Sequence, residues 1–307
     1  MKTDYLKKKS VVGLLALICC ILWGSAIPSI KSAYAIMELP SSDVASQVLF
    51  AGCRFTLAGI MVALFACIRE KKLLLPDANV LKLAPILCLA QTVGQYFFFY
   101  IGVAHSSGVS GAIITGIGNF IAILFSCLIL RMENMTSRKA MGCLLGFAGI
   151  VIINLFGGGE LGGFHMMGQG FLLISQTMYA ISSVMIAIFS KKASPVLLSG
   201  YQFFIGGLLL CAIGCGMGGQ LTGMTASAAI ILLYLAMVSA VAYTLWSILL
   251  AHNPVSNVAI WGFINPLASV ILSALVLKEY AQAFHIRSLI ALACVCLGIF
   301  IVNKGKE

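Results

Sequence analysis

Polar side chains recur at helical spacing inside several long apolar runs of this chain. Thr115 and Asn119 are four residues apart, as are Gln91 and Gln95, so each pair shares one face of a helix. Polar groups in an apolar medium are costly unless they face water, a ligand or a partner. Five runs carry such a stripe, which predicts a central cavity with hydrogen-bonding walls. The candidate lining residues are Trp23, Arg54, Gln95, Tyr96, Asn119, Gln176, Tyr179, Tyr243, Trp246, Trp261 and Asn265.

Packing between helices is the alternative role for any one of these residues. Asn, Gln, Ser and Thr often hydrogen-bond across helix interfaces inside a membrane, where small residues permit close approach. Both roles stay open for a single residue. The set as a whole favours a cavity, because five separate stripes are more than packing requires.

Arg54 is the one charged residue near the middle of an apolar run. Its planar fork could bind a carboxylate or a phosphate, or it could bond to helix carbonyls or reach a watery vestibule, and these roles stay open. All nine acidic residues lie at run ends, in loops or at the termini, so no buried carboxylate pairs with Arg54 or relays protons. If the cavity serves to carry a solute across the membrane, this pattern favours movement of the solute down a gradient, or its exchange for another solute, over strict coupling to protons. The groups that could titrate at the rims are Glu133, Glu279, His105 and His252.

The composition indicates what kind of elements must position these residues. Of 307 residues, 61% are hydrophobic and only 9% are charged, and the mean hydropathy is +1.07. A soluble domain has about 25% charged residues, so soluble and disordered classes are excluded. The net charge of +10 does not indicate nucleic-acid binding, because the 19 basic residues are divided among long apolar runs. We predict an all-α integral membrane protein whose surroundings are the lipid bilayer.

A helix needs about 20 apolar residues to cross about 30 Å of hydrocarbon. Ten runs meet this length, and none shows the period-two alternation of a barrel strand. They cover residues 11–37, 44–68, 80–103, 108–130, 137–156, 167–189, 195–216, 226–249, 254–277 and 285–303. The first run continues through Pro28, longer than a secretory signal core, so we expect it to be retained as a span.

The basic residues predict the orientation of these spans. With the N-terminus inside, the inner segments hold fifteen Lys and Arg residues. The outer segments hold only Lys31, Lys278 and Arg287. This positive-inside bias fits an even number of spans and predicts that both termini are cytoplasmic.

The two halves of the chain share matched polar positions. The Tyr-to-His spacing is nine residues in both halves, and the Asn-to-Glu spacing is fourteen in both. The matched pairs are Tyr96 and Tyr243, His105 and His252, Asn119 and Asn265, and Glu133 and Glu279. Each half holds five spans, an odd number, so the second copy must enter the membrane upside down. We therefore predict inverted repeats over 11–154 and 167–303, joined by a Gly-rich external linker over 155–166.

These motifs resemble the EamA type of the drug/metabolite transporter superfamily, over the whole chain as two copies. The resemblance rests on Trp23-Gly24, on Arg54-Phe55, on Glu133 and Glu279 at the ends of the fourth and ninth runs, and on the Gly-Ile-x-Ile-x-Asn ending of each half. It implies ten helices, a central cavity and alternating access. The second copy departs from the first, since Tyr179-Ala180 stands where Trp23-Gly24 stands and Gln202 where Arg54 stands. The two copies are therefore expected to contribute different side chains to the site.

From this resemblance we expect a multi-pass secondary transporter of the plasma membrane that exports small organic metabolites, such as amino acids. No ligand spacing in the sequence indicates a metal, and we expect no cofactor. Uptake or exchange by the same fold is the alternative. Aromatic side chains would stack on the substrate, amides would hydrogen-bond to it, and Arg54 would attract an anionic group. The substrate, the coupling ion and the oligomeric state stay open.

An intramembrane serine hydrolase is the alternative from another functional class. The segments Gly108-Val109-Ser110-Gly111 and Ala104-His105-x-x-Gly108 resemble the motifs of rhomboid proteases. In that family the serine and the histidine come from different helices, whereas here they are five residues apart at one helix start. Since a nucleophile needs its base within hydrogen-bond reach, we expect no catalysis. The eleven cysteines lie mostly in apolar runs without C-x-x-C spacing, so we expect packing roles for them.

Overall fold

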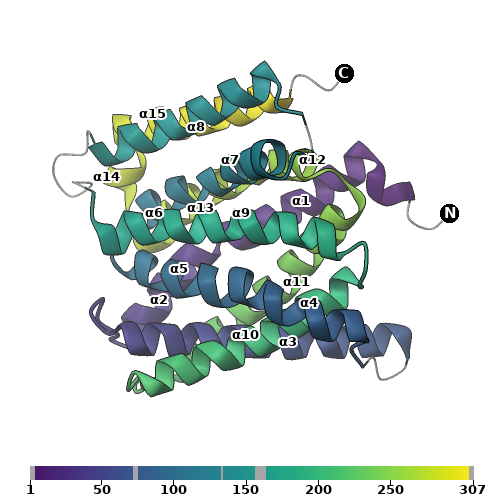
Figure 1. Ribbon diagram of the computed structural model, residues 1–307. Helices are drawn as coiled ribbons and strands as arrows, with labels where there is room; N and C mark the ends of the chain where they lie inside the picture. The colour runs from purple at the N-terminus through teal and green to yellow at the C-terminus, as the bar shows by residue number, and fades with distance from the viewer. Residues whose placement is uncertain (1–3, 72–74, 133, 156–163, 304–307) are drawn as a thin grey trace.

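The computed structural model describes residues 4–71, 75–132, 134–155 and 164–303, and every regular element in these ranges is helical (Figure 1). The long helices lie roughly side by side, and the two ends of the described chain lie at the same end of the bundle (Figure 1). The α-helices are α1 (Lys9–Gly24), α2 (Ala26–Ile36), α3 (Val44–Glu70), α4 (Ala78–Cys88), α5 (Gln95–Ala104), α6 (Gly108–Thr115), α7 (Ile117–Leu124), α8 (Ser137–Leu155), α9 (Phe171–Phe189), α10 (Pro195–Gly216), α11 (Ala226–His252), α12 (Val255–Ala259), α13 (Ile264–Leu277), α14 (Tyr280–Ala283) and α15 (Ile286–Asn303). Short 3-10 helices are η1 (Asp4–Lys7) and η5 (Ile260–Phe263), and π-helical segments are η2 (Leu89–Gly94), η3 (Phe125–Ile129) and η4 (Met166–Gly170).

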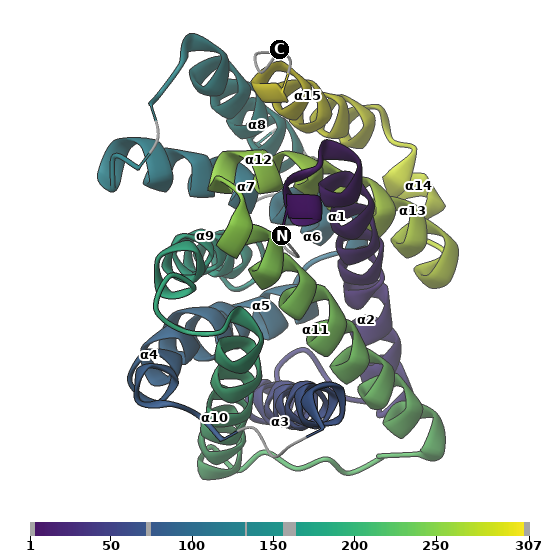
Figure 2. The same cartoon turned by 90° about the vertical axis from the view of Figure 1, so that its right-hand side faces the viewer.

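Eight helical segments of the described chain are long and apolar enough to cross a bilayer. They are Ser10–Ile36, Val44–Ile68, Ala78–Ala104, Gly108–Ile129, Met166–Phe189, Pro195–Gly216, Ala226–His252 and Asn257–Leu277. Two further long helices, α8 and α15, pack against each other along one edge of the bundle (Figure 1, Figure 2). The prediction of an all-α membrane protein is confirmed.

Helices α3 and α10 lie side by side along the opposite edge of the bundle (Figure 1, Figure 2). Glycines bring their backbones together: a Cβ atom on Gly59 would lie 2.5 Å from the amide nitrogen of Phe204, and one on Gly214 would lie 2.7 Å from that of Leu49. Both distances are shorter than real Cβ contacts, so these positions require the absence of a side chain. Small residues in this arrangement let membrane helices gain dispersion contacts along their whole length.

The helix contacts between the two halves come in matched sets. Helix α1 packs against α11 and α13, while α9 packs against α5 and α7. Helix α11 packs against α3, while α10 packs against α4. Helices at matched positions in the two halves also contact each other, namely α3 with α10, α6 with α13, and α8 with α15. The two halves therefore share one interior.

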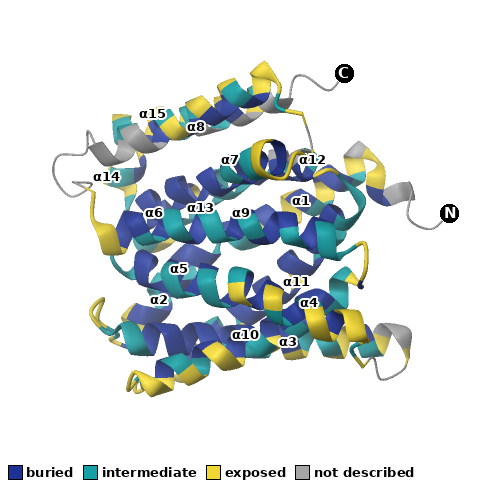
Figure 3. Ribbon diagram, in the orientation of Figure 1, coloured by how far each residue is buried: buried dark blue, intermediate teal, exposed yellow. Residues whose placement is uncertain are grey.

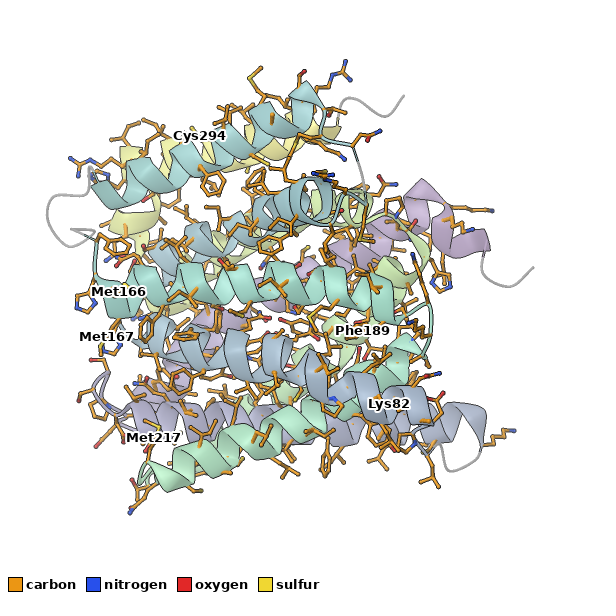
Figure 4. All side chains as sticks on the ribbon, in the orientation of Figure 1. Lys82, Met166, Met167, Phe189, Met217 and Cys294 are labelled. Atoms are coloured by element: carbon orange, nitrogen blue, oxygen red, sulfur yellow. The ribbon has the colours of Figure 1, made fainter. Side chains whose placement is uncertain are left out.

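The outer surface of the bundle is apolar. Phe65 on α3 and Leu144 on α8 are 58% and 70% exposed, and Figure 3 shows buried residues concentrated on the inward sides of the helices. Such a surface suits hydrocarbon rather than water. Met166, Met167 and Met217 are labelled at one end of the bundle, whereas Lys82 lies toward the end where the chain ends are found (Figure 4).

Candidate functional site

A cavity of about 50 Å³ lies inside the bundle, between the two halves. The first half of the chain supplies nine of its lining residues and the second half supplies five. The lining residues are Trp23, Ala26, Ile27, Arg54, Gln95, Tyr96, Phe99, Thr115, Asn119, Gln176, Tyr179, Tyr243, Gly262 and Asn265.

Interrupted helices surround this cavity. Helix α1 ends at Gly24 and α2 begins at Ala26, where Pro28 has no N–H to bond to the Gly24 carbonyl. Helix α6 ends at Thr115, and α7 begins at Ile117 after Gly116. These breaks place Trp23, Ala26, Thr115 and Asn119 along the cavity wall.

Two other spans change their helical pitch next to the same cavity. The π-helical segment η2 runs directly into Gln95 at the start of α5. The 3-10 segment η5 holds Gly262 and runs into α13, where Pro266 cannot bond to the Gly262 carbonyl. Departures from α-helix are frequent at functional sites, and in transporters they occur where a helix lines a cavity.

Aromatic rings form one wall of the cavity. The Trp23 ring lies edge-on to Tyr243, with centroids 4.9 Å apart, and to Tyr179, with centroids 6.3 Å apart. The hydroxyl groups of Tyr96 and Tyr243 are hydrogen-bonded to each other, and Gln95 Nε2 donates to the Tyr243 hydroxyl at 3.2 Å. The rings therefore hold one another in place along the cavity wall.

The amides along the cavity have spare hydrogen-bonding capacity. Within the described ranges, the side-chain amides of Asn119, Gln176 and Asn265 make no hydrogen bond, although all three line the cavity. Among the lining residues, two buried atoms are unpartnered as well, the Gln95 Oε1 acceptor and the Trp23 Nε1 donor. Buried polar atoms are normally satisfied, so this cluster is arranged for water or for a polar ligand.

Arg54 is buried at the cavity wall, with 1% of its surface exposed. Its Nε donates to the Leu235 carbonyl at 3.0 Å and to Ser239 Oγ at 2.9 Å, and its Nη1 donates to the Tyr100 hydroxyl at 3.0 Å. The guanidinium carbon also lies 5.1 Å from the centre of the Phe55 ring. All of these partners are neutral.

Nine of the eleven residues that the sequence singled out lie around this cavity, and Trp246 and Trp261 do not. Trp246 packs behind Trp23, with ring centroids 5.0 Å apart. Trp261 packs against α1, where a Cβ atom on Gly13 would lie 2.8 Å from its ring. Four other lining residues, Ala26, Ile27, Phe99 and Gly262, were not predicted, because apolar residues and glycine give no signal within an apolar run. Thr115 also lines the cavity, and the sequence had placed it on a polar helix face without selecting it as a site residue.

The rim residues of the sequence repeat have mainly structural partners. Glu279 accepts hydrogen bonds from the backbone amides of Gly108 and Val109 at 3.1 and 2.9 Å, which caps α6 from the other half of the chain. His105 and His252 each place Nδ1 2.9 Å from the carbonyl four residues earlier in the chain. Glu133 and the Gly-rich segment 157–163 lie outside the described residues.

The residues considered for catalysis and metal binding do not converge. The Ser110 amide bonds to Ser107 Oγ as part of the α6 cap, and His105 Nδ1 faces the Ile101 carbonyl. In the part of the chain that the structure describes, no group of three His, Cys, Asp or Glu side chains is placed to hold a metal ion. The Sγ atoms of Cys53 and Cys211 lie 4.0 Å apart at the α3–α10 contact and form no disulfide.

A model of the EamA-like transporter family matches the chain twice, over residues 11–155 and 166–304. Relatives of similar length carry transporter names. The uncharacterized transporter YetK of Bacillus subtilis (strain 168) is 27% identical over 270 residues, which are 84% of this chain and 79% of YetK. YvbV of the same organism, also named an uncharacterized transporter, is 25% identical over 97% of this chain and 93% of its own length.

A third relative and a solved structure extend the likeness. The uncharacterized inner membrane transporter YedA of Escherichia coli (strain K12) is 25% identical over 93% of this chain and 88% of YedA. A crystal structure of another protein matches with a TM-score of 0.68 and 18% identity, over 97% of this chain and 98% of that chain. At this identity the match shows a shared fold.

Proposed function

The chain belongs to the EamA-like transporter family, and we propose that it is a secondary transporter that exports small organic metabolites, amino acids or related compounds, by alternating access. The observation that carries the proposal is the cavity lined by polar and aromatic side chains from both halves of the chain. Export is the direction that the family resemblance implies, and uptake or exchange through the same cavity is the alternative.

The size of the cavity supports a mechanism in which the helices move. The cavity has a volume of about 50 Å³, and by the same measure one water molecule needs about 10–15 Å³. A solute of amino-acid size therefore enters only when the lining helices separate. The interrupted helices α1–α2, α6–α7 and α12–α13 line the cavity, so they are the helices that we propose to separate.

We propose that residues 11–154 and 167–303 form inverted repeats of five spans each, joined by an external linker over 155–166. The matched contacts between the halves support this arrangement. An inverted pseudo-twofold axis would map the α1–α11 contact onto the α9–α5 contact, and it would map α3 onto α10. Ten spans result when α8 and α15 are added to the eight apolar segments.

The orientation is proposed from the distribution of charge. The described chain ends lie on the same side of the bundle (Figure 1), as an even number of spans requires. That side also carries Lys82 (Figure 4), together with the loops that hold Lys71, Arg131 and Lys191. Basic residues are retained on the cytoplasmic side, so both termini are proposed to be cytoplasmic in a plasma-membrane protein.

We assign substrate contacts to the nine predicted residues that line the cavity. Trp23, Tyr179 and Tyr243 supply ring surfaces, and Asn119, Gln176 and Asn265 supply free amide donors and acceptors. Trp246 supports this wall by packing against Trp23, and Trp261 packs against α1 near Gly13. Coupling to a gradient or by exchange is proposed over proton coupling, since the described cavity wall contains no carboxylate.

A metabolite-release experiment tests the proposal. The full chain is reconstituted in vesicles preloaded with a total small-metabolite extract, and mass spectrometry follows what leaves the vesicles. We expect one chemical class to leave wild-type vesicles and to be retained when Asn119 and Asn265 are both replaced by alanine. Equal release by the wild type and the folded double variant would rule out this cavity as the transport route.

A further inference from the structure

We propose that the cavity selects solutes that carry a carboxylate, which docks on the free edge of the Arg54 guanidinium, and that Tyr100 and Ser239 are positioning residues for that guanidinium. This inference rests on the proposed transport function and names the chemical class of its substrate. Neither Tyr100 nor Ser239 lines the cavity, and both are fully buried.

The hydrogen bonds of Arg54 leave one edge of its fork unused. Nε bonds to Leu235 and Ser239 on α11, and Nη1 bonds to Tyr100 on α5. Nη2 has no hydrogen-bond partner among the described residues, although the Arg54 side chain contributes to the cavity wall. An arginine fixed at Nε and Nη1 can offer Nη2 in a constant direction, and this geometry suits one oxygen of a carboxylate.

The charge balance around Arg54 points to an anion as the missing partner. The residues that contact its guanidinium are a carbonyl, a serine, a tyrosine and the rings of Phe55 and Tyr96, and none carries a charge. No Asp or Glu is present among the described lining residues. A buried cation without a counter-charge is costly in a membrane, and an anionic solute supplies that counter-charge.

A purely structural role for Arg54 is the competing explanation, because its bonds tie α3 to α5 and α11. The two explanations differ in one measurable property. A structural tie changes the stability of the protein and leaves its preference between solutes unchanged. A docking site changes the preference between a carboxylate and its neutral amide.

Binding is measured with four probes that share one leucine side chain. These are leucine, leucinamide, N-acetyl-leucine and N-acetyl-leucinamide, so carboxylate and ammonium groups vary independently. The chain has three tryptophans, of which Trp23 lines the cavity and Trp246 packs on Trp23, so intrinsic fluorescence of the full chain in nanodiscs reports binding. We expect each acid to bind roughly 10- to 100-fold more tightly than its amide, as for a hydrogen bond to a charged group.

Variants assign this preference to Arg54. In Arg54→Gln the acid and the amide should bind equally, and in Tyr100→Phe and Ser239→Ala the ratio should fall while amide binding is unchanged. Arg54→Lys keeps the charge and loses the fork, so it should restore part of the ratio; it also provides a test if Arg54→Gln does not fold. Arg287→Gln removes an arginine at the start of α15, outside the cavity, and should keep the wild-type ratio.

The outcomes separate this inference from the transport proposal. Amides that bind as tightly as acids in the wild type, or an acid preference that survives in Arg54→Gln, would overturn the docking of a carboxylate on Arg54. Export of neutral metabolites alone from the preloaded vesicles would also overturn it and would leave the transport proposal intact. Tight binding of N-acetyl-leucine that depends on Arg54, without release of any metabolite, would support the docking site and remove the transport proposal.

Discussion

Tyr96 and Tyr243 stand at equivalent positions of the two sequence repeats, and their hydroxyl groups are hydrogen-bonded to each other beside the cavity. Tyr96 belongs to α5 in the first half, and Tyr243 belongs to α11 in the second. Gln95 strengthens the link by donating to the Tyr243 hydroxyl at 3.2 Å. Any movement that parts the two halves at this level must break or exchange this bond.

A double-mutant cycle tests the coupling between these two tyrosines. Tyr96→Phe and Tyr243→Phe should each lower stability by about 1 kcal/mol, as expected for one buried hydrogen bond. The double variant should lose less than the sum of the two single losses, because both remove the same bond. Thermal unfolding followed by size-exclusion chromatography measures all four proteins. Strictly additive losses would show that the two hydroxyls are not coupled in the membrane protein.

Gln176 and Thr177 are adjacent on α9 and provide a matched pair for the cavity. The Gln176 amide lines the cavity, whereas Thr177 Oγ1 donates to the Leu173 carbonyl at 3.0 Å on its own helix. Gln176→Ala should lower metabolite release roughly tenfold, the cost of one lost polar contact. Thr177→Val should release metabolites at the wild-type rate. The assignment fails if both variants behave alike in the vesicle assay.

Gly59 and Gly216 provide a matched pair for the α3–α10 contact. A Cβ atom on Gly59 would lie 2.5 Å from the Phe204 amide nitrogen, whereas one on Gly216 would meet nothing within 4 Å. Gly59→Ala should therefore destabilise the protein by about 1–3 kcal/mol through overpacking. Gly216→Ala should be neutral or slightly stabilising, because alanine favours the helix. Comparison of the two melting temperatures in detergent checks this, and a stable Gly59→Ala would contradict the close approach.

Glu279 and Glu38 allow a test of the cap that links the two halves. Glu279 accepts two backbone hydrogen bonds at the start of α6, and Glu38 is an exposed residue beyond the end of α2. Glu279→Gln removes the charge and one of the two carboxylate acceptors, so stability should fall by about 1 kcal/mol. Glu38→Gln should have no effect on the melting temperature. Equal behaviour of the two variants would argue against a stabilising role for the cap.

Much of the fold was predictable because each span is a long apolar run. The sequence selected eleven candidate residues, of which nine line the cavity. Asn119 and Asn265 were selected by four-residue spacing, and both line the cavity. The same spacing did not place Trp261 at the cavity, because it lies in η5, a 3-10 segment with a different number of residues per turn. Trp246 lies three residues after Tyr243, and its ring packs against Trp23 instead of lining the cavity.

The partners of Arg54 could not be predicted from the sequence. Tyr100, Leu235 and Ser239 lie on two other helices, and their meeting with Arg54 depends on how α3, α5 and α11 cross. Spacing along one helix gives no information about such crossings. The helix break at Pro28 follows from the chemistry of proline, whereas the π-helical segment Leu89–Gly94 has no comparable signature.

The neutral surroundings of Arg54 have a consequence for the energy source of transport. A membrane that is negative inside drives an anion outward, with about 2.3 kcal/mol per elementary charge for every 100 mV. In the export proposed for this chain, a solute with one negative charge, bound to a fixed cation that no carboxylate of the described residues neutralises, would leave the cell electrically downhill without a coupled proton or sodium ion. Transport would then carry current, and the resting potential alone would set the ratio of solute concentrations at which export stops.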